Sequence, residues 1–182
     1  MERFFGKKKD QLKESFKIGA EILGEDDPIL EALLIYLSYS VLNQVGLGDD
    51  FVIELNSIGI QKEQDKYREE LLSFYENKKH LLTDEGLKQL EANPMKLLRS
   101  SDEDERILAQ EAPQITRFLK KKSKEHYVKV KEYLDLLGVS YDEKPSLMAK
   151  YNYHSNTVWA FRTAKGKKIV SGARYNPLAS LL

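Results

Sequence analysis

The order of the sequence patterns predicts a mixed α+β fold in which a long helical stretch interrupts a sheet. Residues 13–24 alternate between apolar and polar side chains, which is typical of a half-buried strand. Residues 26–45 begin with acidic residues and Pro28, continue with apolar residues at helical spacing and stop at Gly46, which predicts a helix. Residues 51–55 form a short apolar strand. The N-terminal part is therefore expected to run strand, helix, strand.

The middle of the chain is expected to be entirely helical. Residues 61–80 form a charged amphipathic helix, Thr83 is placed to cap the next one, and Pro94 and Pro113 interrupt the later segments. No convincing strand pattern occurs between residues 84 and 137. The economical interpretation is a helical insertion in an α/β frame, with three parts: residues 1–59, 60–138 and 139–182.

The C-terminal part is expected to return to extended structure at residues 138–141. Residues 151–162 are aromatic and β-branched, residues 165–168 form a turn, and residues 169–172 form the next strand, which predicts an antiparallel hairpin. A short helix is expected to begin near Asn176.

Composition excludes several functional classes. Lys and Arg together number 29, as do Asp and Glu, so no global basic field favours nucleic acid or anionic lipid. The absence of cysteine excludes disulfides, thiolate metal sites and cysteine nucleophiles, and fits a reducing, cytoplasmic location. The longest apolar run, residues 29–41, contains Glu31 and is shorter than the roughly 20 residues of a membrane helix. His80, His126 and His154 lack ligand spacing, so no metal site is predicted.

Two polar patterns leave alternatives open. A basic cluster is either a solvated helical face or a contact for phosphate groups; it comprises Lys120, Lys121, Lys122, Lys124, Lys129 and Lys131. Lys17 and Glu21 are four residues apart in one expected strand and would share a face, either as a binding pair or as solvated charges.

Aromatic residues in the expected C-terminal hairpin leave a similar choice. They either line a pocket for a flat ring or belong to the core, which is the commoner role of aromatic strand residues. The residues concerned are Tyr151, Tyr153, His154, Trp159 and Phe161.

Segments in a fixed order resemble the histidyl-tRNA synthetase family. Residues 54–59, 67–69 and 93–98 resemble the passage by which these enzymes enter and cross their helical insertion domain, and residues 102–113 and 136–141 continue it. Residues 18–24 resemble the strand that closes the family's motif 2. Residues 147–161 and 171–176 occupy the places of its histidine-specific signature and of its glycine-glycine-arginine-tyrosine-aspartate segment. The likeness covers almost the whole chain.

This resemblance implies an incomplete class II synthetase-like antiparallel sheet with flanking helices and an all-helical insertion. The chain would start inside motif 2 and stop before motif 3, without motif 1 or the anticodon domain. The implied activity is ATP-dependent activation of histidine and its transfer to tRNA, with ATP and Mg²⁺ as cofactors. The implied partners are histidine, ATP and the tRNA acceptor region, with a homo-oligomer or a companion chain left open and no membrane.

The resemblance also assigns site residues. Glu21 matches the carboxylate that holds the substrate ammonium group, a pairing of opposite charges. The implied histidine-binding residues are Glu21, Lys17, Tyr153, His154 and Tyr175. The implied ATP-binding residues are Arg3 and Arg174. The implied tRNA-binding residues are Lys120, Lys121, Lys122 and Lys124.

Several positions depart from the family pattern. Ala149 stands where the family has an arginine that stabilises charge on the α-phosphate, and loss of one such donor typically costs about 10²–10³ in rate. No catalytic residue is therefore assigned. Lys17 replaces a glutamine, His154 a tyrosine, Ala173 a glycine and Asn176 an aspartate; Asn152 also departs from an expected aspartate.

The sequence therefore predicts a histidine–tRNA ligase-like protein, truncated or degenerate and inactive alone. The alternative is a non-catalytic histidine- or tRNA-binding regulatory paralogue, such as the regulatory subunit of ATP phosphoribosyltransferase. A stand-alone tRNA-binding module is a third interpretation.

Overall fold

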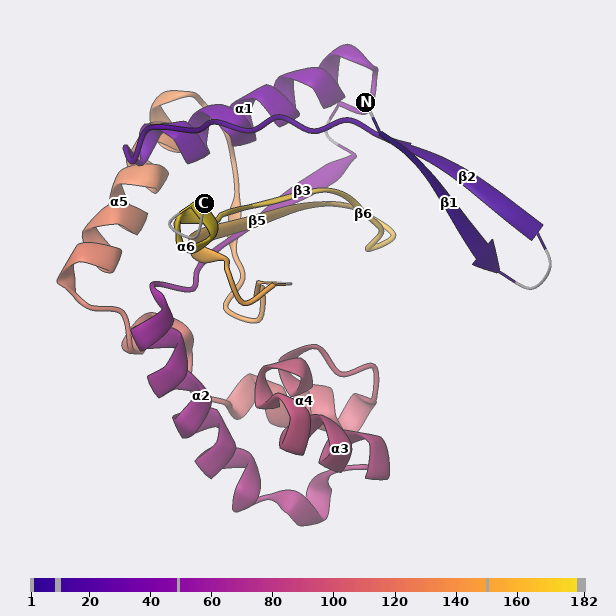
Figure 1. Cartoon of the computed structure of the whole chain (residues 1–182), viewed down its shortest axis with the longest axis vertical. Coiled ribbons are helices and arrows are strands. Elements are labelled where there is room, and N and C mark those ends of the chain that lie inside the picture. The colour runs from indigo at the N-terminus through magenta and orange to yellow at the C-terminus, as the bar shows by residue number, and fades with distance from the viewer. Residues whose placement is uncertain (1, 9–10, 49, 150, 180–182) are drawn as a thin grey trace.

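A four-stranded sheet with the order β4-β3-β5-β6 forms the centre of the molecule (Figure 1). The computed structural model describes residues 2–8, 11–48, 50–149 and 151–179. Strand β3 pairs in parallel with the two-residue β4 and antiparallel with β5, and β5 pairs antiparallel with β6. The strands are β3 (Phe51–Ser57), β4 (Asp142–Glu143), β5 (Ser155–Thr163) and β6 (Lys168–Arg174).

The predicted C-terminal hairpin is confirmed. The Thr163 and Lys167 backbones are hydrogen-bonded, and Gly166 adopts a φ of 75° that suits a glycine at the tip of the turn. Two register shifts interrupt the β5–β6 ladder, one of them between Ser155 and Val158. Asn156 lies there with a φ of 50°, a left-handed conformation that asparagine adopts more readily than most residues.

Two helices cover one face of the sheet. Helix α1 (Ile29–Gln44) follows the Pro28 start predicted from the sequence, and α5 (Lys121–Leu136) packs beside it. Trp159 and Phe161 of β5 point into this layer and are almost completely buried. Both rings therefore belong to the core, the second of the two roles left open by the sequence.

The opposite face of β5 packs toward the helical stretch, because side chains alternate along a strand. Val158 and Ala160 join a second cluster with residues of that stretch, including Tyr67, Leu71 and Tyr75. The sheet thus lies between two layers. The elements of the stretch are α2 (Gln61–Glu76), η1 (Lys79–Leu81), α3 (Asp84–Ala92), η2 (Pro94–Arg99), α4 (Glu103–Glu111) and η3 (Ile115–Arg117).

The absence of strands between residues 84 and 137 is confirmed, and the expected helix breaks occur at Pro94 and Pro113. Thr83 caps α3 by accepting a 3.0 Å hydrogen bond from the Gly86 amide, as its residue type predicts. The division into parts at residues 59 and 138 stays a prediction. In the structure, α5 packs on α1 and the sheet, whereas α2, α3 and α4 contribute to the second cluster.

A buried carboxylate fastens the two ends of the stretch that runs from α2 to η3. Glu63, 1% exposed, accepts hydrogen bonds from the Ile60 amide at 2.8 Å and the Lys120 amide at 2.6 Å. The Ser123 hydroxyl donates a third bond at 2.7 Å. Gly59 makes room for this carboxylate, since a Cβ there would lie 2.2 Å from Glu63 Oε2.

The predicted strand over residues 13–24 is only partly correct. Strand β2 (Gln11–Lys17) ends at Lys17 and pairs with β1 (Glu2–Lys8) in a separate hairpin. Residues 18–23 have no regular structure, and Ile18 is 84% exposed. Alternation identifies a strand only where another strand pairs with it, and no described strand pairs with this segment. Lys17 and Glu21 therefore do not share the face of one strand.

The aromatic strand also starts later than predicted. Residues 151–153 form a bend and turn, and β5 begins at Ser155. The short helix near the end is confirmed as α6 (Asn176–Ala179). Among the described residues no helix is both long enough and apolar enough to cross a membrane.

Candidate functional site

Several of the predicted site residues lie at one end of the β5–β6 hairpin. Ser155, the first residue of β5, pairs with Arg174, the last residue of β6. Because the strands are antiparallel, the residue before Ser155 and the residue after Arg174 leave the sheet at the same end. The register thus brings His154 and Tyr175 to a common edge of the sheet.

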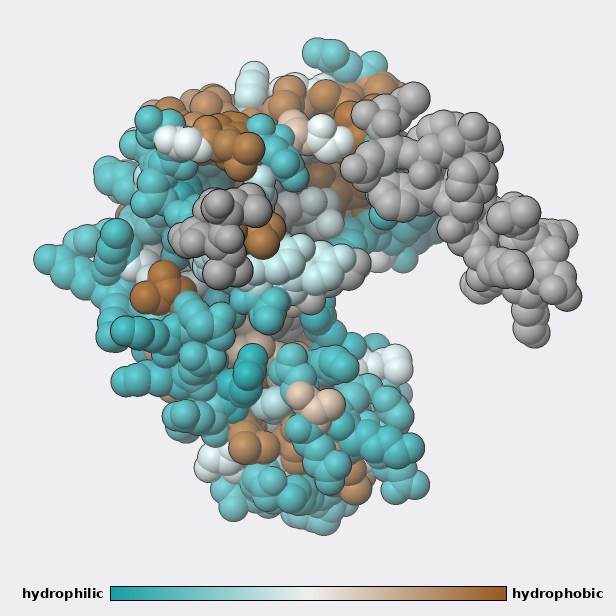
Figure 2. Space-filling model, viewed as in Figure 1, coloured by the Kyte–Doolittle hydropathy of each residue, from teal (hydrophilic) through white to brown (hydrophobic). Residues whose placement is uncertain are grey.

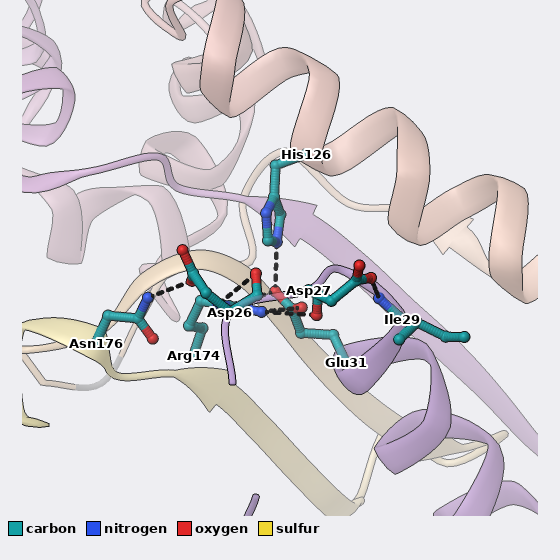
Figure 3. A network of polar contacts seen from close by, with 7 residues as sticks. All are labelled: Asp26, Asp27, Ile29, Glu31, His126, Arg174 and Asn176. Carbon is teal, nitrogen blue, oxygen red and sulfur yellow. Dashed lines mark hydrogen bonds and ion pairs between the residues drawn. The ribbon is translucent and has the colours of Figure 1, made fainter. Parts of the chain in front are cut away.

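Arg174 is the centre of a buried polar network at this end (Figure 3). Its side chain is 6% exposed and that of Glu31 is 4% exposed. The guanidinium donates to both oxygens of Glu31, from Nε at 2.9 Å and from Nη2 at 2.6 Å, which is the bidentate geometry typical of strong arginine–carboxylate pairs. His126, on α5, contacts Glu31 Oε1 through Nε2 at 2.7 Å.

The remaining donors of Arg174 hold the segment that precedes α1. Nη1 donates to the Asp26 carboxylate and to its carbonyl oxygen at 3.3 Å, and Nη2 donates to the Asp27 carbonyl at 3.2 Å. All five N–H groups of the guanidinium are therefore used inside the chain. Asn176 adds a 2.7 Å hydrogen bond to the Asp26 carboxylate.

The network favours the charged forms of Glu31 and Arg174. Burial alone would raise the pKa of Glu31, but hydrogen bonds and charges from His126 and Arg174 lower it overall. Burial alone would lower the pKa of Arg174, but Glu31, and then Asp26 and Asp27, raise it overall. The pair is thus an ion pair at neutral pH.

Two of the predicted histidine-binding residues lie near each other beside this network. Glu21 lies in the segment that Arg174 fastens, and Tyr175 directly follows Arg174. Burial raises the pKa of the Tyr175 hydroxyl, and the charge of Glu21 and hydrogen bonding to it raise it further. An exposed carboxylate beside a half-buried phenol can accept hydrogen bonds from an ammonium group.

Three predicted ring residues, Tyr151, Tyr153 and His154, form an aromatic cluster just before β5. Tyr151 and Tyr153 are stacked, with ring centroids 5.1 Å apart, and the His154 ring meets both edge-on. His154 Nδ1 is buried without a hydrogen-bond partner, and burial lowers the pKa of this histidine. The cluster is held at its base because Gln64 donates to the His154 carbonyl at 3.0 Å.

Other predicted residues lie apart from this end of the sheet or outside the described residues. Lys17 is the exposed last residue of β2. Arg3 belongs to β1, but its side chain lies outside the described residues, as does Lys150. The four lysines assigned to tRNA are exposed at the start of α5, where only Lys121 has an ion pair in the described contacts, 3.8 Å from Glu125. Ala149 packs, partly buried, against the core of the helical stretch.

Of the two residues predicted to bind ATP, Arg3 and Arg174, the structure describes the side chain of Arg174 alone. Arg174 has no N–H free for a phosphate, and no group of three acidic or histidine side chains in the described part of the chain is arranged to hold a metal ion. No step is therefore assigned to ATP on these residues.

Sequence reasoning missed the roles of Asp26 and His126, gave Glu31 no role, and noted Asn176 only as a departure from the family pattern and as the start of a helix. Glu31 did carry a signal, since it is the one charged residue in the apolar run 29–41 and a buried charge needs a partner. Its partner could not be identified from the sequence, because Arg174 is 143 residues away.

Comparison with known proteins finds relatives of this chain. No family model matches the chain. It is 30% identical over 181 residues to the histidine–tRNA ligase of Gluconobacter oxydans, covering 98% of this chain and 44% of that protein. It is 32% identical over 167 residues to the enzyme of Aquifex aeolicus, covering 91% and 41%.

Solved structures show the same resemblance. Apo histidyl-tRNA synthetase of S. aureus superposes with a TM-score of 0.63 at 27% identity, over 87% of this chain and 39% of that one. A Bacillus halodurans C protein described as an ATP phosphoribosyltransferase regulatory subunit/histidyl-tRNA synthetase superposes with a TM-score of 0.53 over 86% of this chain and 45% of that one. At 18% identity this second match shows the fold alone.

The sheet and its flanking helices therefore form a class II synthetase-like fold, as predicted. Within that class, the chain is histidyl-tRNA synthetase-like: it is similar along nearly its whole length to part of that enzyme. It spans about two fifths of the length of the curated relatives that it matches.

Proposed function

We propose that the chain is a histidine-binding part of a histidyl-tRNA synthetase-like protein and does not catalyse aminoacylation alone. The observation that supports this most directly is the juxtaposition of Glu21 and Tyr175 at the end of the β5–β6 hairpin. Glu21 would bind the α-ammonium group of histidine, and Tyr153 and His154 would lie along the imidazole. Lys17 would be a peripheral charge.

The buried network would act as the support of this site. Arg174 fastens Asp26 and Asp27, and so holds the segment carrying Glu21 across the end of β6. In this proposal Arg174 is a positioning residue, and any contact with ATP would require it to release one of its present hydrogen bonds.

Absence of activity in the chain alone is expected for two reasons. Ala149 carries no charge at the family's arginine position and packs against apolar side chains. In addition, Arg174 has no N–H free to contact ATP while its present hydrogen bonds hold. A histidine-dependent pyrophosphate exchange assay should show no turnover, and turnover near that of whole histidyl-tRNA synthetases would contradict the proposal.

Histidine binding can be tested by calorimetry with matched ligands and variants. Histamine retains the ammonium group and should bind, whereas imidazolepropionate lacks it and should bind at least 10-fold more weakly. Glu21→Gln should lose the same factor, since a hydrogen bond to a charged group contributes about 1.5–3 kcal/mol. Glu25→Gln changes an exposed carboxylate in the same segment and should leave binding unchanged. Equal binding by both Glu variants would contradict the role of Glu21.

A second proposal concerns tRNA. Lys120, Lys121, Lys122 and Lys124 form an exposed basic surface at the start of α5, which supports contact with phosphates of the tRNA acceptor region. Filter binding of histidine tRNA should weaken steeply with salt and lose part of its salt dependence in a Lys122→Gln, Lys124→Gln double variant. A chain that only senses histidine, as in the regulatory-subunit alternative, would show no tRNA affinity at any salt concentration.

We also propose that this part of the protein associates with a companion chain or a second copy. The outer face of α1 supports such a partner, because it leaves Leu33, Leu37 and Val41 between 41% and 48% exposed. Figure 2 shows the hydrophobic surface that gathers over this helix. We propose that this partnership occurs in the cytoplasm and that ATP and Mg²⁺ bind only in its presence.

A further inference from the structure

A pocket of about 480 Å³ lies where the helical stretch meets the segment that leads to β5. Helix α2, the end of η2, helix α4, the link to η3 and residues 144–146 contribute to it. Its lining includes Leu98, Arg99, Arg106, Gln110, Pro113 and Lys144. None of the residues lining this pocket belongs to the sites that the resemblance assigns to histidine, ATP or tRNA.

The charges around this pocket are all positive. Arg99, Arg106 and Lys144 line it, and no carboxylate does. None of these three side chains has a hydrogen bond or ion pair in the contacts between described residues. Elsewhere in the described chain, exposed cations do pair with acids, as Lys78 does with Glu111 at 2.6 Å. A chain with equal numbers of acidic and basic residues thus leaves three cations around one cavity.

Helix α4 separates opposite charges on its two sides. Asp104 and Glu111 line a different pocket together with Ile107 and Leu108. Arg106 and Gln110 face the basic pocket instead. Residues three and four apart share a helical face, so this separation follows from the positions of the residues in the sequence. Asp104 and Glu111 therefore line the other pocket and are absent from the lining of the basic one.

A further cation lies near the lining: Arg162, which is itself paired with Glu54 at 2.7 Å. Burial lowers the pKa of Arg99, and the nearby positive charge of Arg162 lowers it further. Arginine stays charged at neutral pH despite such shifts. An anion in the pocket would relieve this repulsion. Guanidinium groups match the planar oxygens of a phosphate with parallel N–H···O hydrogen bonds, which makes phosphate the anion best suited to two arginines.

The pocket is too large for a bare phosphate. Its volume falls within the roughly 300–1,000 Å³ typical of small-molecule sites. Leu98 and Pro113 supply apolar wall, and the amide of Gln110 can both donate and accept hydrogen bonds. We propose that this pocket binds a phosphorylated small molecule, with the phosphate on Arg99, Arg106 and Lys144 and the uncharged part against Leu98, Pro113 and Gln110.

This inference is independent of the proposed histidine site and can be tested separately by NMR. Inorganic phosphate, titrated into the ¹⁵N-labelled chain at constant ionic strength, should shift the amide signals of the non-proline residues in 98–100, 106–114 and 144–146. AMP should shift the same signals at a concentration at least 10-fold lower, because its uncharged part also contacts the pocket. Adenosine, which lacks the phosphate, should bind at least 10-fold more weakly than AMP.

Variants locate the binding. Arg106→Gln and Lys144→Gln should each weaken AMP binding by about 10-fold or more, the effect of losing a charge-assisted hydrogen bond. Arg117→Gln removes an exposed arginine outside the lining and should leave AMP binding unchanged. A thermal melt of each variant checks the fold.

Three results would overturn the proposal. One is the absence of shifts with both phosphate and AMP, and another is equal affinity for the two, which would mean an anion site without a place for a larger molecule. The third is AMP shifts confined to residues around Glu21 and Tyr175 and unaffected by the pocket variants. That last result would place the nucleotide at the other site and leave the histidine-binding proposal standing.

Discussion

Arg174 and Glu31, 143 residues apart, make two parallel hydrogen bonds of 2.9 and 2.6 Å in the interior of the protein. The pair joins the end of β6 to the first turn of α1, and the same guanidinium reaches the backbone before that helix. The side chain of Arg174 therefore fixes the position of the segment before α1 at the end of the sheet.

Replacing Arg174 by methionine should destabilise the fold strongly. The change leaves Glu31 buried without its main partner, and breaking a buried ion pair on one side typically costs about 3–5 kcal/mol. Urea denaturation followed by circular dichroism measures this loss in the free energy of unfolding. Arg162→Met is the comparison, since Arg162 pairs with Glu54 at 2.7 Å but is 34% exposed, and such pairs contribute about 1 kcal/mol or less. Equal losses in both variants would contradict a special role of Arg174.

The contribution of Glu31 should depend on pH. Its pKa is lowered below 4.5 in the folded chain, despite burial, by His126 and Arg174. The unfolded chain therefore binds more protons in this range, so the stabilisation is complete above about pH 4.5 and is lost as the pH falls through the folded-state pKa. The difference in unfolding free energy between the wild type and Glu31→Gln should shrink from pH 7 to pH 3. A constant difference in unfolding free energy would mean that Glu31 stabilises the fold through its packing and not through its charge.

Tyr175 should ionise at higher pH than an ordinary tyrosine. Burial and then Glu21 raise the pKa of its hydroxyl above 10.0. NMR titration of ¹³Cζ-labelled tyrosine, with Tyr175→Phe for assignment, measures this value. Glu21→Gln should lower it toward 10 and Glu25→Gln should not. An unchanged pKa of Tyr175 in the Glu21 variant would mean that the two side chains do not interact. It would then remove the basis of the proposed histidine site.

Gly172 should not tolerate a side chain. A Cβ at this position would lie 2.1 Å from Cζ2 of the buried Trp159 ring, so alanine would push the ring or bend β6. Overpacking of this kind costs about 1–3 kcal/mol. The matched change Gly19→Ala meets no atom within 4 Å and should leave the melting temperature within error. Calorimetry of both variants tests whether Gly172 packs closely against the Trp159 ring.

Local chemistry made much of this fold predictable. The start of α1 at Pro28, the cap at Thr83 and the turn at Gly166 are properties of single residues and their neighbours, and all three are found. Residues 18–23 were predicted wrongly because their alternating pattern is also local, whereas the pairing that makes a strand depends on distant backbone. The same limit applies to Tyr153 and His154, which precede β5 instead of lying in it.

The candidate site follows the same division. Family-like residues pointed to Glu21 and Tyr175, which lie close enough for Glu21 to raise the pKa of Tyr175. The sequence could not show that every donor of Arg174 is used within the chain, because its partners come from residues 26, 27 and 31 at the other end of the molecule's sequence. The pattern of charges in the sequence also could not show which residues of α4 line the basic pocket, because this depends on how the helix packs against residues 144–146.

The hydrogen bonds of Glu63 bear on how such a protein can change in evolution. Its two oxygens receive the amides of Ile60 and Lys120, so the chain leaves for the helices α2 to η3 and comes back from them at nearly one point. Segments whose two ends lie close together are tolerated as insertions, because they can be lengthened, shortened or exchanged without displacing the strands on either side. The helices between these amides are therefore free to diverge in size and surface while the sheet keeps its register.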